Sequence, residues 1–350
     1  MIGGAKRTAI NVAQSLVTNT PQVLCNHIVK LPLSNFKNDN RIDLEQEKLF
    51  YRHRLLTCML GNIMSVFGVC YSPYHRSNAF PPSGVTEADV DADMSIIASR
   101  KFDHIRTYAV DGGNQWNVDK ATKYHLKLAL GVWVTPNDLA ATKAQIDKAL
   151  LQSQSAGNKY GTRLDLDLVI GNEVNRQDVG IYTPDLIRAA MKHAKGEVPR
   201  YPAVTARVTT CFSGTVLQNP NSEWLPVVDD CDTNVYLTVY PWYGGAAPGN
   251  IDPQMQWSWD NGLKQVRERG KQVVIAEIGW PSAGGRETSV ANEKTNYEVT
   301  KKWVSGTNPL RMAFDTYWFE MFDEPWKTQE GPQGPHWGLY TSGSNPQPKF

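Results

Sequence analysis

The sequence has no excess of charge of either sign and no long apolar segment. Among 350 residues, 36 lysines and arginines nearly balance 35 aspartates and glutamates, which gives a net charge of +1. A chain with so little net charge lacks the field that attracts nucleic acid or an anionic membrane surface. No run of 18 apolar residues occurs, so the sequence predicts no transmembrane helix. We therefore expect neither nucleic acid nor a membrane as a partner.

Motifs for metals and cofactors are also missing. The five cysteines are odd in number and include no CxxC pair, which argues against a zinc site or a dense disulfide framework. Cys211 and Cys231 are candidates for a single disulfide, although packed or free thiols are the favoured interpretation for all five. The seven histidines form no HExxH spacing, and the glycine-rich stretches lack the Lys-Ser/Thr of a phosphate loop. We expect no metal and no cofactor.

Tryptophan is absent from the first 115 residues, and all eleven tryptophans lie between Trp116 and Trp337. We expect about half of them to fill the core. Several, however, lie beside the ends of strand-like segments and have polar neighbours, an environment that suits the apolar faces and polar edges of a sugar ring. The residues in this position are Trp133, Trp242, Trp280, Trp318, Trp326 and Trp337.

Residues 1–63 differ from the rest of the chain because they show no sustained strand or helix period. The stretch 52–68 has a basic start and an apolar body, as in a secretory signal, but it lies far from residue 1. It also fits an amphipathic helix leading into the first strand. One hypothesis is that translation starts at Met59 or Met64, which N-terminal sequencing of native protein would refute by finding a start before residue 50. We predict an extension over 1–63, disordered or absent from the mature protein, and a catalytic domain over 64–350.

Eight apolar, β-branched segments follow at intervals of roughly 25 to 42 residues, about the length of a βα unit. Helical patterns occupy several of the intervals. Thr86 and Asp89 form a capping-box spacing, Thr183 precedes a proline at a helix start, and Gly270 and Gly306 close two further helices. The strand-like segments are 65–71, 102–110, 126–134, 164–173, 203–210, 233–242, 271–277 and 311–319.

This alternation predicts an α/β fold, specifically a single (β/α)8 TIM barrel, which typically needs about 250 residues. The alternative is a doubly wound open sheet. That fold usually has a glycine-rich phosphate turn after its first strand, whereas the segment that follows here is YSPYHRSNAFPPSG, rich in proline and aromatic residues.

Two of the strand-like segments end in glutamate, in VIGNEVNR (Glu173) and VVIAEIGWPS (Glu277). A partly enclosed carboxylate is costly unless it is paired or has a function. The carboxyl ends of all barrel strands meet at one mouth, so Glu173 and Glu277 are expected to face each other there. Two carboxylates at one cleft suit cleavage of a glycosidic bond, although both side chains also fit ordinary helix caps or salt bridges.

Several motifs together resemble glycoside hydrolase family 17, the β-1,3-glucanases and glucanosyltransferases. They are FGVCYSPY, GNEVNR, AEIGWPSAGG, YWFEMFDEPWK and GPHWGLY, which occur in the family's order from about residue 66 to about residue 345. The resemblance implies a (β/α)8 barrel and a retaining mechanism. It assigns the general acid/base to Glu173 and the nucleophile to Glu277, and it places the family's supporting Glu and Lys at Glu324 and Lys327.

Further substrate-binding candidates follow from position at strand ends or from the same resemblance. Asn172 is expected to bond a sugar hydroxyl next to the reacting carbon, and Arg106 to orient the nucleophile or pair structurally. The hydroxyl of Tyr240 is expected to touch Glu277. Lys327 is expected to hold a carboxylate, to bond sugar or to pair with Glu324. The remaining candidates, for which core packing is the competing interpretation, are Tyr71, Tyr108, Trp242, Tyr243 and Trp280.

The leading hypothesis is therefore a retaining, endo-acting β-1,3-glucan hydrolase that uses Glu173 and Glu277. A β-1,3-glucanosyltransferase with the same residues is the alternative, because water and a sugar hydroxyl can resolve the same glycosyl-enzyme. The YPWY stretch and the segment after FDEPWK are closer to the fungal and bacterial type than to the plant type. A non-catalytic glucan-binding barrel would retain the aromatic residues but lose a carboxylate. We expect a monomer. We also expect a secreted or periplasmic protein, because the polysaccharide substrate usually lies outside the cytoplasm.

Overall fold

The structure is a computed structural model, and it describes residues 65–78, 82–176, 182–214 and 222–350. Residues 65–350 form one compact unit. The predicted extension over 1–63 and the proposed start sites at Met59 and Met64 lie outside the described residues.

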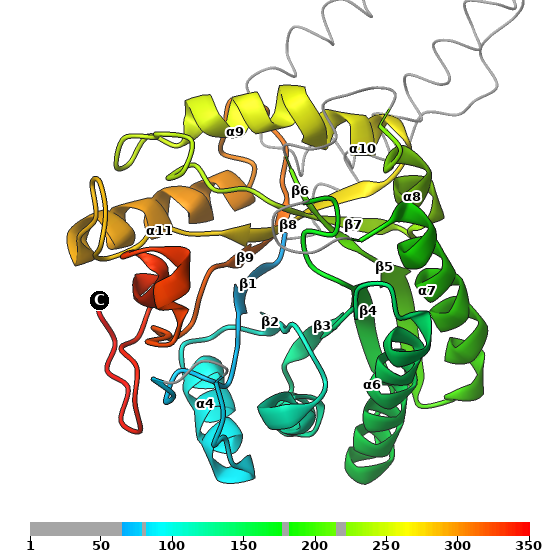
Figure 1. Cartoon of the computed structure of the whole chain (residues 1–350). Coiled ribbons are helices and arrows are strands. Elements are labelled where there is room, and N and C mark those ends of the chain that lie inside the picture. The colour runs from blue at the N-terminus through cyan, green and yellow to red at the C-terminus, as the bar shows by residue number, and fades with distance from the viewer. Residues whose placement is uncertain (1–64, 79–81, 177–181, 215–221) are drawn as a thin grey trace, which may run out of the picture. The chain divides into compact units, whose positions relative to one another are not determined.

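Nine parallel strands form the centre of this unit (Figure 1). Each of the eight predicted strand segments contains a strand, and a ninth, short one follows the fifth segment. The strands are β1 (Phe67–Cys70), β2 (His104–Arg106), β3 (Lys127–Val132), β4 (Leu164–Ile170), β5 (Val204–Thr209), β6 (Cys211–Ser213), β7 (Asn234–Thr238), β8 (Gln272–Ile278) and β9 (Asp315–Trp318).

The sheet closes into a barrel around Thr210, the residue that joins β5 to β6. The strand order is β5-β4-β3-β2-β1-β9-β8-β7-β6, so the two edge strands, β5 and β6, are consecutive in sequence. The hydroxyl of Thr210 donates to the carbonyl of Ile170 (2.5 Å), and its own carbonyl accepts from the amide of Tyr236 (3.3 Å). The chain therefore pairs with β4 through β5 and with β7 through β6, and the predicted (β/α)8 barrel is confirmed.

Helices surround the strands (Figure 1). The four predicted helices are present, and the sequence analysis did not identify α5, α6 and α8. The helices are α4 (Glu87–Ser99), α5 (Asn117–Lys123), α6 (Leu139–Tyr160), α7 (Pro184–Glu197), α8 (Leu225–Asp230), α9 (Asp252–Ser258), α10 (Lys264–Glu268) and α11 (Val290–Val304). Short turns of 3-10 helix lie at 112–116, 198–200, 327–330 and 334–336, and a π-helical turn at 259–263 joins α9 to α10. No helix in the described part of the chain is long and apolar enough to cross a membrane.

The predicted helix ends are confirmed. Thr86 and Asp89 form a reciprocal capping box at the start of α4, and the hydroxyl of Thr183 accepts from the amide of Leu186 at the start of α7. Gly270 and Gly306 adopt φ values of +75° and +83° just after α10 and α11. That left-handed conformation is accessible to glycine without a steric penalty, so both residues end their helices cleanly.

Two hydrophobic clusters hold the barrel together. The larger lies where the strands meet the helices, and the smaller contains inward-facing strand residues such as Ala129, Val169 and Val274. Cys70 and Cys211 belong to the smaller cluster, and both are buried free thiols. Cys231 is also buried and free, so the predicted alternative of a Cys211–Cys231 disulfide is wrong. Cys25 and Cys58 lie outside the described residues. The filled barrel leaves its mouth as the place for a site.

Candidate active site

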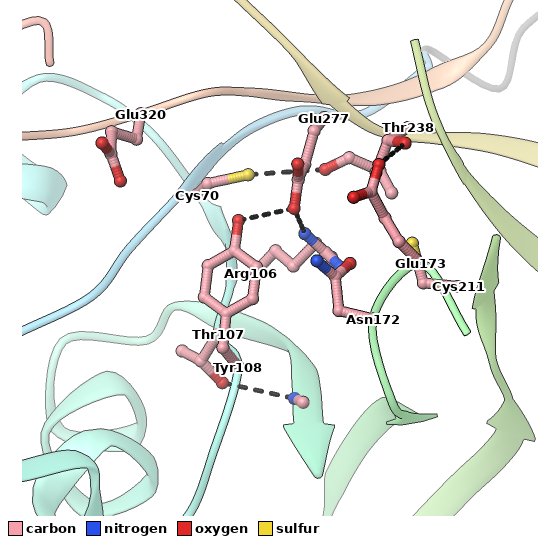
Figure 2. A network of polar contacts seen from close by, with 12 residues as sticks. Cys70, Arg106, Thr107, Tyr108, Asn172, Glu173, Cys211, Thr238, Glu277 and Glu320 are labelled. Atoms are coloured by element: carbon pink, nitrogen blue, oxygen red, sulfur yellow. Dashed lines mark hydrogen bonds and ion pairs between the residues drawn. The ribbon is translucent and has the colours of Figure 1, made fainter. Parts of the chain in front are cut away.

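Three donors from two segments, the end of β2 and the turn after β7, hold the carboxylate of Glu277, which lies in β8 and is 4% exposed. Arg106 Nη1 donates to its Oε1 over 2.5 Å, and the hydroxyl of Tyr108 donates to the same oxygen over 2.9 Å. The hydroxyl of Tyr240 donates to Oε2 over 2.6 Å. The first two contacts are drawn in Figure 2. Three donors suit an ionised carboxylate, which can only accept hydrogen bonds.

Arg106 also fixes the residue beside the second glutamate. Its Nη2 donates to Asn172 Oδ1 over 2.6 Å, while its Nη1 donates to Glu277 (Figure 2). The side chain is buried at the end of β2, so its planar, two-donor group has little freedom to move. One guanidinium thus connects the Glu277 carboxylate of β8 to the Asn-Glu turn after β4, and the predicted contact between Arg106 and the proposed nucleophile is present.

Glu173 occupies a different environment, in the turn that follows β4. It has a positive φ of +48°, which few residues other than glycine adopt. Its Oε1 accepts from the hydroxyl of Thr238 (2.5 Å), and its Oε2 accepts from Arg176 Nη1 (2.5 Å). Burial and the nearby charge of Glu277 nevertheless raise the pKa of Glu173 above its ordinary value. Glu173 therefore keeps its proton to a higher pH than a free glutamate does.

The side chains of Glu173 and Glu277 extend toward the same space from opposite sides, as Figure 2 shows. Their electrostatic interaction contributes to the raised pKa of Glu173. One carboxylate thus accepts three hydrogen bonds, and the other is disposed to carry a proton. Two carboxyl groups kept in different protonation states can act as nucleophile and acid in the cleavage of a glycosidic bond.

Aromatic side chains pack beside Glu277, around the hydroxyl donor Tyr240. We call this group the aromatic wall. The ring of Tyr240 lies 5.7 Å from that of Tyr243 and 5.4 Å from that of Trp337, and Trp242 lies 4.9 Å from Tyr243. Tyr243 is 59% exposed, whereas Trp242 is half-buried with its Nε1 donating to a backbone carbonyl. The predicted contact between Tyr240 and Glu277 is present, and Trp242 and Tyr243 retain surface for a sugar. The wall consists of Tyr240, Trp242, Tyr243, Phe319 and Trp337.

A second pair of glutamates, Glu320 and Glu324, lies after β9, and both are buried with Lys327. The ammonium of Lys327 is 2.9 Å from Glu320 Oε2 and 2.5 Å from Glu324 Oε2. Burial and the charge of Glu324 raise the pKa of Glu320, whereas Lys327 overcomes the effect of burial and lowers the pKa of Glu324. Ser72 also donates to Glu324 (2.5 Å). Glu324 and Lys327 therefore form the predicted ion pair, and their burial does not support direct contact with sugar.

Two predicted substrate contacts are not supported by the structure. Tyr71 is fully buried, and its hydroxyl donates to Asp93 Oδ2 over 2.8 Å. Trp280 is fully buried as well, and its Nε1 donates to the carbonyl of Glu287 over 2.9 Å. Each side chain uses its apolar ring in the core and satisfies its polar atom within the protein, so core packing was the correct interpretation for both.

Sequence reasoning missed Thr238 and Glu320. Thr238 lies two residues before Tyr240 in a strand segment, so alternation of side chains predicts that both face the barrel interior. This period-two signal was available in the sequence. Glu320 carries no comparable signal, because its burial depends on the path of the chain after β9. Among the described residues, no group of three or more His, Cys, Asp or Glu side chains is arranged to hold a metal ion.

Sequence relatives of this chain include fungal proteins. A putative glucan endo-1,3-beta-glucosidase, btgC, of Aspergillus niger is 26% identical over 323 residues, covering 82% of this chain and 43% of the relative. The glucan endo-1,3-beta-glucosidase btgC of Emericella nidulans is 25% identical, covering 80% of this chain and 45% of the relative. The chain thus spans less than half the length of these curated relatives.

Solved structures share the fold. A glycoside hydrolase family 17 beta-1,3-glucanosyltransferase from Rhizomucor miehei superposes with a TM-score of 0.61 at 23% identity, covering 81% of this chain and 96% of that one. One of two plant beta-glucan endohydrolases superposes with a TM-score of 0.60 at 21% identity, covering 81% and 98%. At these identities the likeness establishes the barrel fold alone.

The sequence profile of the BtgE/BtgC glycoside hydrolase domain matches residues 68–338, which is most of the barrel. Both glutamates, Arg106 and the aromatic wall lie inside the matched region. The glycoside hydrolase family that the motifs indicated is thus supported by a match over most of the barrel. The chain belongs to the BtgE/BtgC glycoside hydrolase domain family.

Proposed function

We propose that this barrel cleaves β-1,3-glucan with retention of configuration at the anomeric carbon. The observation that carries the proposal is the pair Glu173 and Glu277, which extend toward one space in opposite electrostatic environments. The fungal relatives named glucan endo-1,3-beta-glucosidase support the choice of substrate.

In the first step, Glu277 attacks the anomeric carbon while Glu173 gives its proton to the departing glycosidic oxygen. The bond to the leaving sugar breaks as the bond to Glu277 forms, which yields a covalent glycosyl-enzyme and a free chain end. Arg106, Tyr108 and Tyr240 hold the attacking carboxylate in place. Since Arg106 occupies the oxygen of Asn172, the amide nitrogen of Asn172 is the group that donates to the sugar hydroxyl beside the reacting carbon.

In the second step, the now ionised Glu173 removes a proton from an incoming hydroxyl, which attacks the same carbon and releases Glu277. Water gives hydrolysis, and a sugar hydroxyl gives chain transfer. The exposed ring of Tyr243, beside Tyr240, offers a surface on which an acceptor sugar could stack in place of water. This feature favours transfer as a second candidate activity.

A timed product analysis tests both activities. The purified protein is incubated with laminarin and with a short β-1,3-glucan oligosaccharide, and the products are separated by chain length. Only shorter chains identify a hydrolase, and early chains longer than the substrate identify a transferase. The Glu277→Gln variant is the control for contaminating activity. No product from either substrate, with a folded protein, overturns the assignment of substrate.

We also propose that the protein is a monomer and that it acts outside the cytoplasm. Both parts of this proposal are supported by the polysaccharide substrate and by the lack of net charge. Light scattering during gel filtration tests the first part, and fractionation of the producing cells tests the second.

A further inference from the structure

Lys349 is a buried cation that has no place in the site described so far. Its side chain is 6% exposed, and its ammonium donates to Ser282 Oγ and to Asp323 Oδ1, each over 2.7 Å. Glu293 Oε2 of α11 lies 3.5 Å away. A buried ammonium is costly unless it is paired. The two acceptors follow β8, which carries Glu277, and β9, so Lys349 connects the segments that leave these two strands.

Backbone contacts hold the segment that carries Lys349, residues 341–350, which we call the tail. The amide of Lys349 donates to the carbonyl of Leu339 over 2.9 Å. The amide of Thr341 donates to the carbonyl of Gln347, and the amide of Gln347 donates to the hydroxyl of Thr341, both over 2.9 Å. The tail therefore folds back on the segment before it. Since these contacts do not involve the ammonium, we expect the tail to stay in place when only the side chain of Lys349 is changed.

The two acceptors of the ammonium hold the residues on either side of Trp337. The hydroxyl of Ser282 donates to the carbonyl of His336 over 3.1 Å, and the amide of Ser282 donates to the same carbonyl over 2.8 Å. Asp323 Oδ1 accepts from the amide of Gly338 over 2.9 Å. A Cβ atom on Gly338 would lie 2.0 Å from the amide nitrogen of Asp323, so the glycine permits this close approach. One ammonium thus fixes the backbone before and after Trp337, through one residue on each side.

Trp337 belongs to the aromatic wall and is 2% exposed. Its ring lies 5.4 Å from that of Tyr240 and 5.7 Å from that of Trp242, edge to face in both cases. The hydroxyl of Tyr240 donates to Glu277 Oε2 over 2.6 Å. Because a close-packed interior transmits displacements, a shift of Trp337 would move the Tyr240 hydroxyl on the proposed nucleophile.

We propose that Lys349 is a positioning residue for the cleavage reaction, which fixes Trp337 and, through it, the Tyr240 hydroxyl on Glu277. This inference rests on the proposed function. It gives a part in the reaction to a residue of the tail, which lies beyond the region 68–338 that the family profile matches. The ammonium itself does not touch the substrate. It acts by keeping the aromatic wall in one arrangement while Glu277 attacks.

The test is a double-mutant cycle between Lys349 and Tyr240, in which kcat on laminarin is measured at a temperature where every variant is folded. Tyr240→Phe keeps the ring in the aromatic wall but removes the hydroxyl on Glu277. In the wild-type background, Lys349→Met should lower kcat by about tenfold, because a small displacement of a group that holds the nucleophile is enough for such a loss. In the Tyr240→Phe background, the same change should lower kcat by less than about twofold, because the hydroxyl through which Lys349 acts is already absent.

Glu293→Gln is the matched control. Glu293 contacts the same ammonium, but it lies in α11, outside the two segments that flank Trp337. Burial raises the pKa of Glu293 to about 9, so glutamine preserves both its shape and its neutral state at pH 7. The kcat of this variant should stay within about twofold of the wild-type value. If Lys349→Met does not fold, Ser282→Ala makes the same test, since it removes the hydroxyl between Lys349 and His336 and leaves the ion pair with Asp323.

The outcomes separate this inference from the proposed function. If the wild type cleaves no β-1,3-glucan, the proposed function fails. If the wild type cleaves and Lys349→Met lowers kcat by the same factor in both backgrounds, or not at all, the inference is refuted, because a purely structural role does not depend on the Tyr240 hydroxyl. A loss in Glu293→Gln as large as that in Lys349→Met also refutes it. A loss that appears only when the Tyr240 hydroxyl is present supports the path from Lys349 to the nucleophile.

Discussion

The barrel contains two pairs of neighbouring glutamates, Glu173 with Glu277 and Glu320 with Glu324, and they are held in different ways. In the second pair a single ammonium, that of Lys327, contacts both carboxylates within 3 Å. In the first pair each carboxylate has its own cation, Arg176 for Glu173 and Arg106 for Glu277. All members of the second pair are buried, whereas Glu173 is only partly buried.

The difference explains why one pair is suited to chemistry and the other to structure. The ammonium of Lys327 lies in contact with both Glu320 and Glu324, and all three side chains are buried, so this pair offers no surface to a substrate. Separate cations on Glu173 and Glu277 leave the two carboxylates facing each other, so their mutual repulsion raises the pKa of the less firmly held one, Glu173, in addition to the effect of burial. Acidic residues alone do not define a glycosidase site. The placement of the cations does.

The largest expected effect comes from removing each carboxylate of the first pair. Glu277→Gln should lower the rate by about 10⁴-fold or more on any glucan, because the nucleophile is lost. Glu173→Gln should lower it by about 10²- to 10⁴-fold on laminarin. On a nitrophenyl laminarioside, whose leaving group needs no proton, Glu173→Gln should still release a rapid burst of nitrophenolate, measured by stopped-flow absorbance. Absence of a burst, or a burst in Glu277→Gln, would reverse or refute the roles.

Removing the shared cation of the second pair should cost stability. Lys327→Met leaves two buried carboxylates without their cation, and loss of one partner of a buried ion pair typically lowers the free energy of unfolding by about 3–5 kcal/mol. Urea denaturation measures the change. Arg176→Met, which removes a partly exposed partner of Glu173, is the matched control and should cost less than about 1 kcal/mol. Similar losses in both variants would contradict the comparison.

Arg106→Lys should keep the positive charge beside Glu277 but lose the planar pair of donors that contacts Glu277 and Asn172. A lysine cannot present two donors in a rigid plane to Glu277 and Asn172, so we expect kcat to fall by roughly 10²-fold with a smaller change in KM. Steady-state kinetics with laminarin measure both constants. Arg207→Lys is the control, because Arg207 binds Asp165 and Asp167 on β4 rather than the proposed catalytic residues. An unchanged kcat in Arg106→Lys would show that charge alone suffices.

The smallest expected effect is a shift of the pH profile in Thr238→Val. The hydroxyl of Thr238 donates to Glu173 and lowers its pKa against the raising effects of burial and Glu277. Without that donor the pKa of Glu173 should rise further, so the acid stays protonated to higher pH and the alkaline limb of kcat/KM moves upward. Thr238→Ser should leave the limb in place. A limb that moves to lower pH in Thr238→Val would exclude Glu173 as the group responsible.

The sequence predicted the barrel because each strand segment carries a strong local signal, and it predicted Glu173 and Glu277 because strand ends and family motifs coincide there. It could not separate Trp280 from Tyr243. Both are aromatic residues near a strand end, and only the path of the neighbouring chain determines that Trp280 is buried while Tyr243 is 59% exposed. Glu320 was missed for the same reason, because its contact with Lys327 forms only when the chain after β9 folds back.

The backbone of Glu173 carries a consequence for anyone who selects improved variants of this protein. A φ of +48° is strained for glutamate and comfortable for glycine or asparagine, with a typical penalty of about 1–3 kcal/mol for such a residue. A library screened only for resistance to heat should therefore enrich glycine or asparagine at position 173. Such variants would have a higher melting temperature but no catalytic activity, so variants at this position have to be selected by turnover of the substrate.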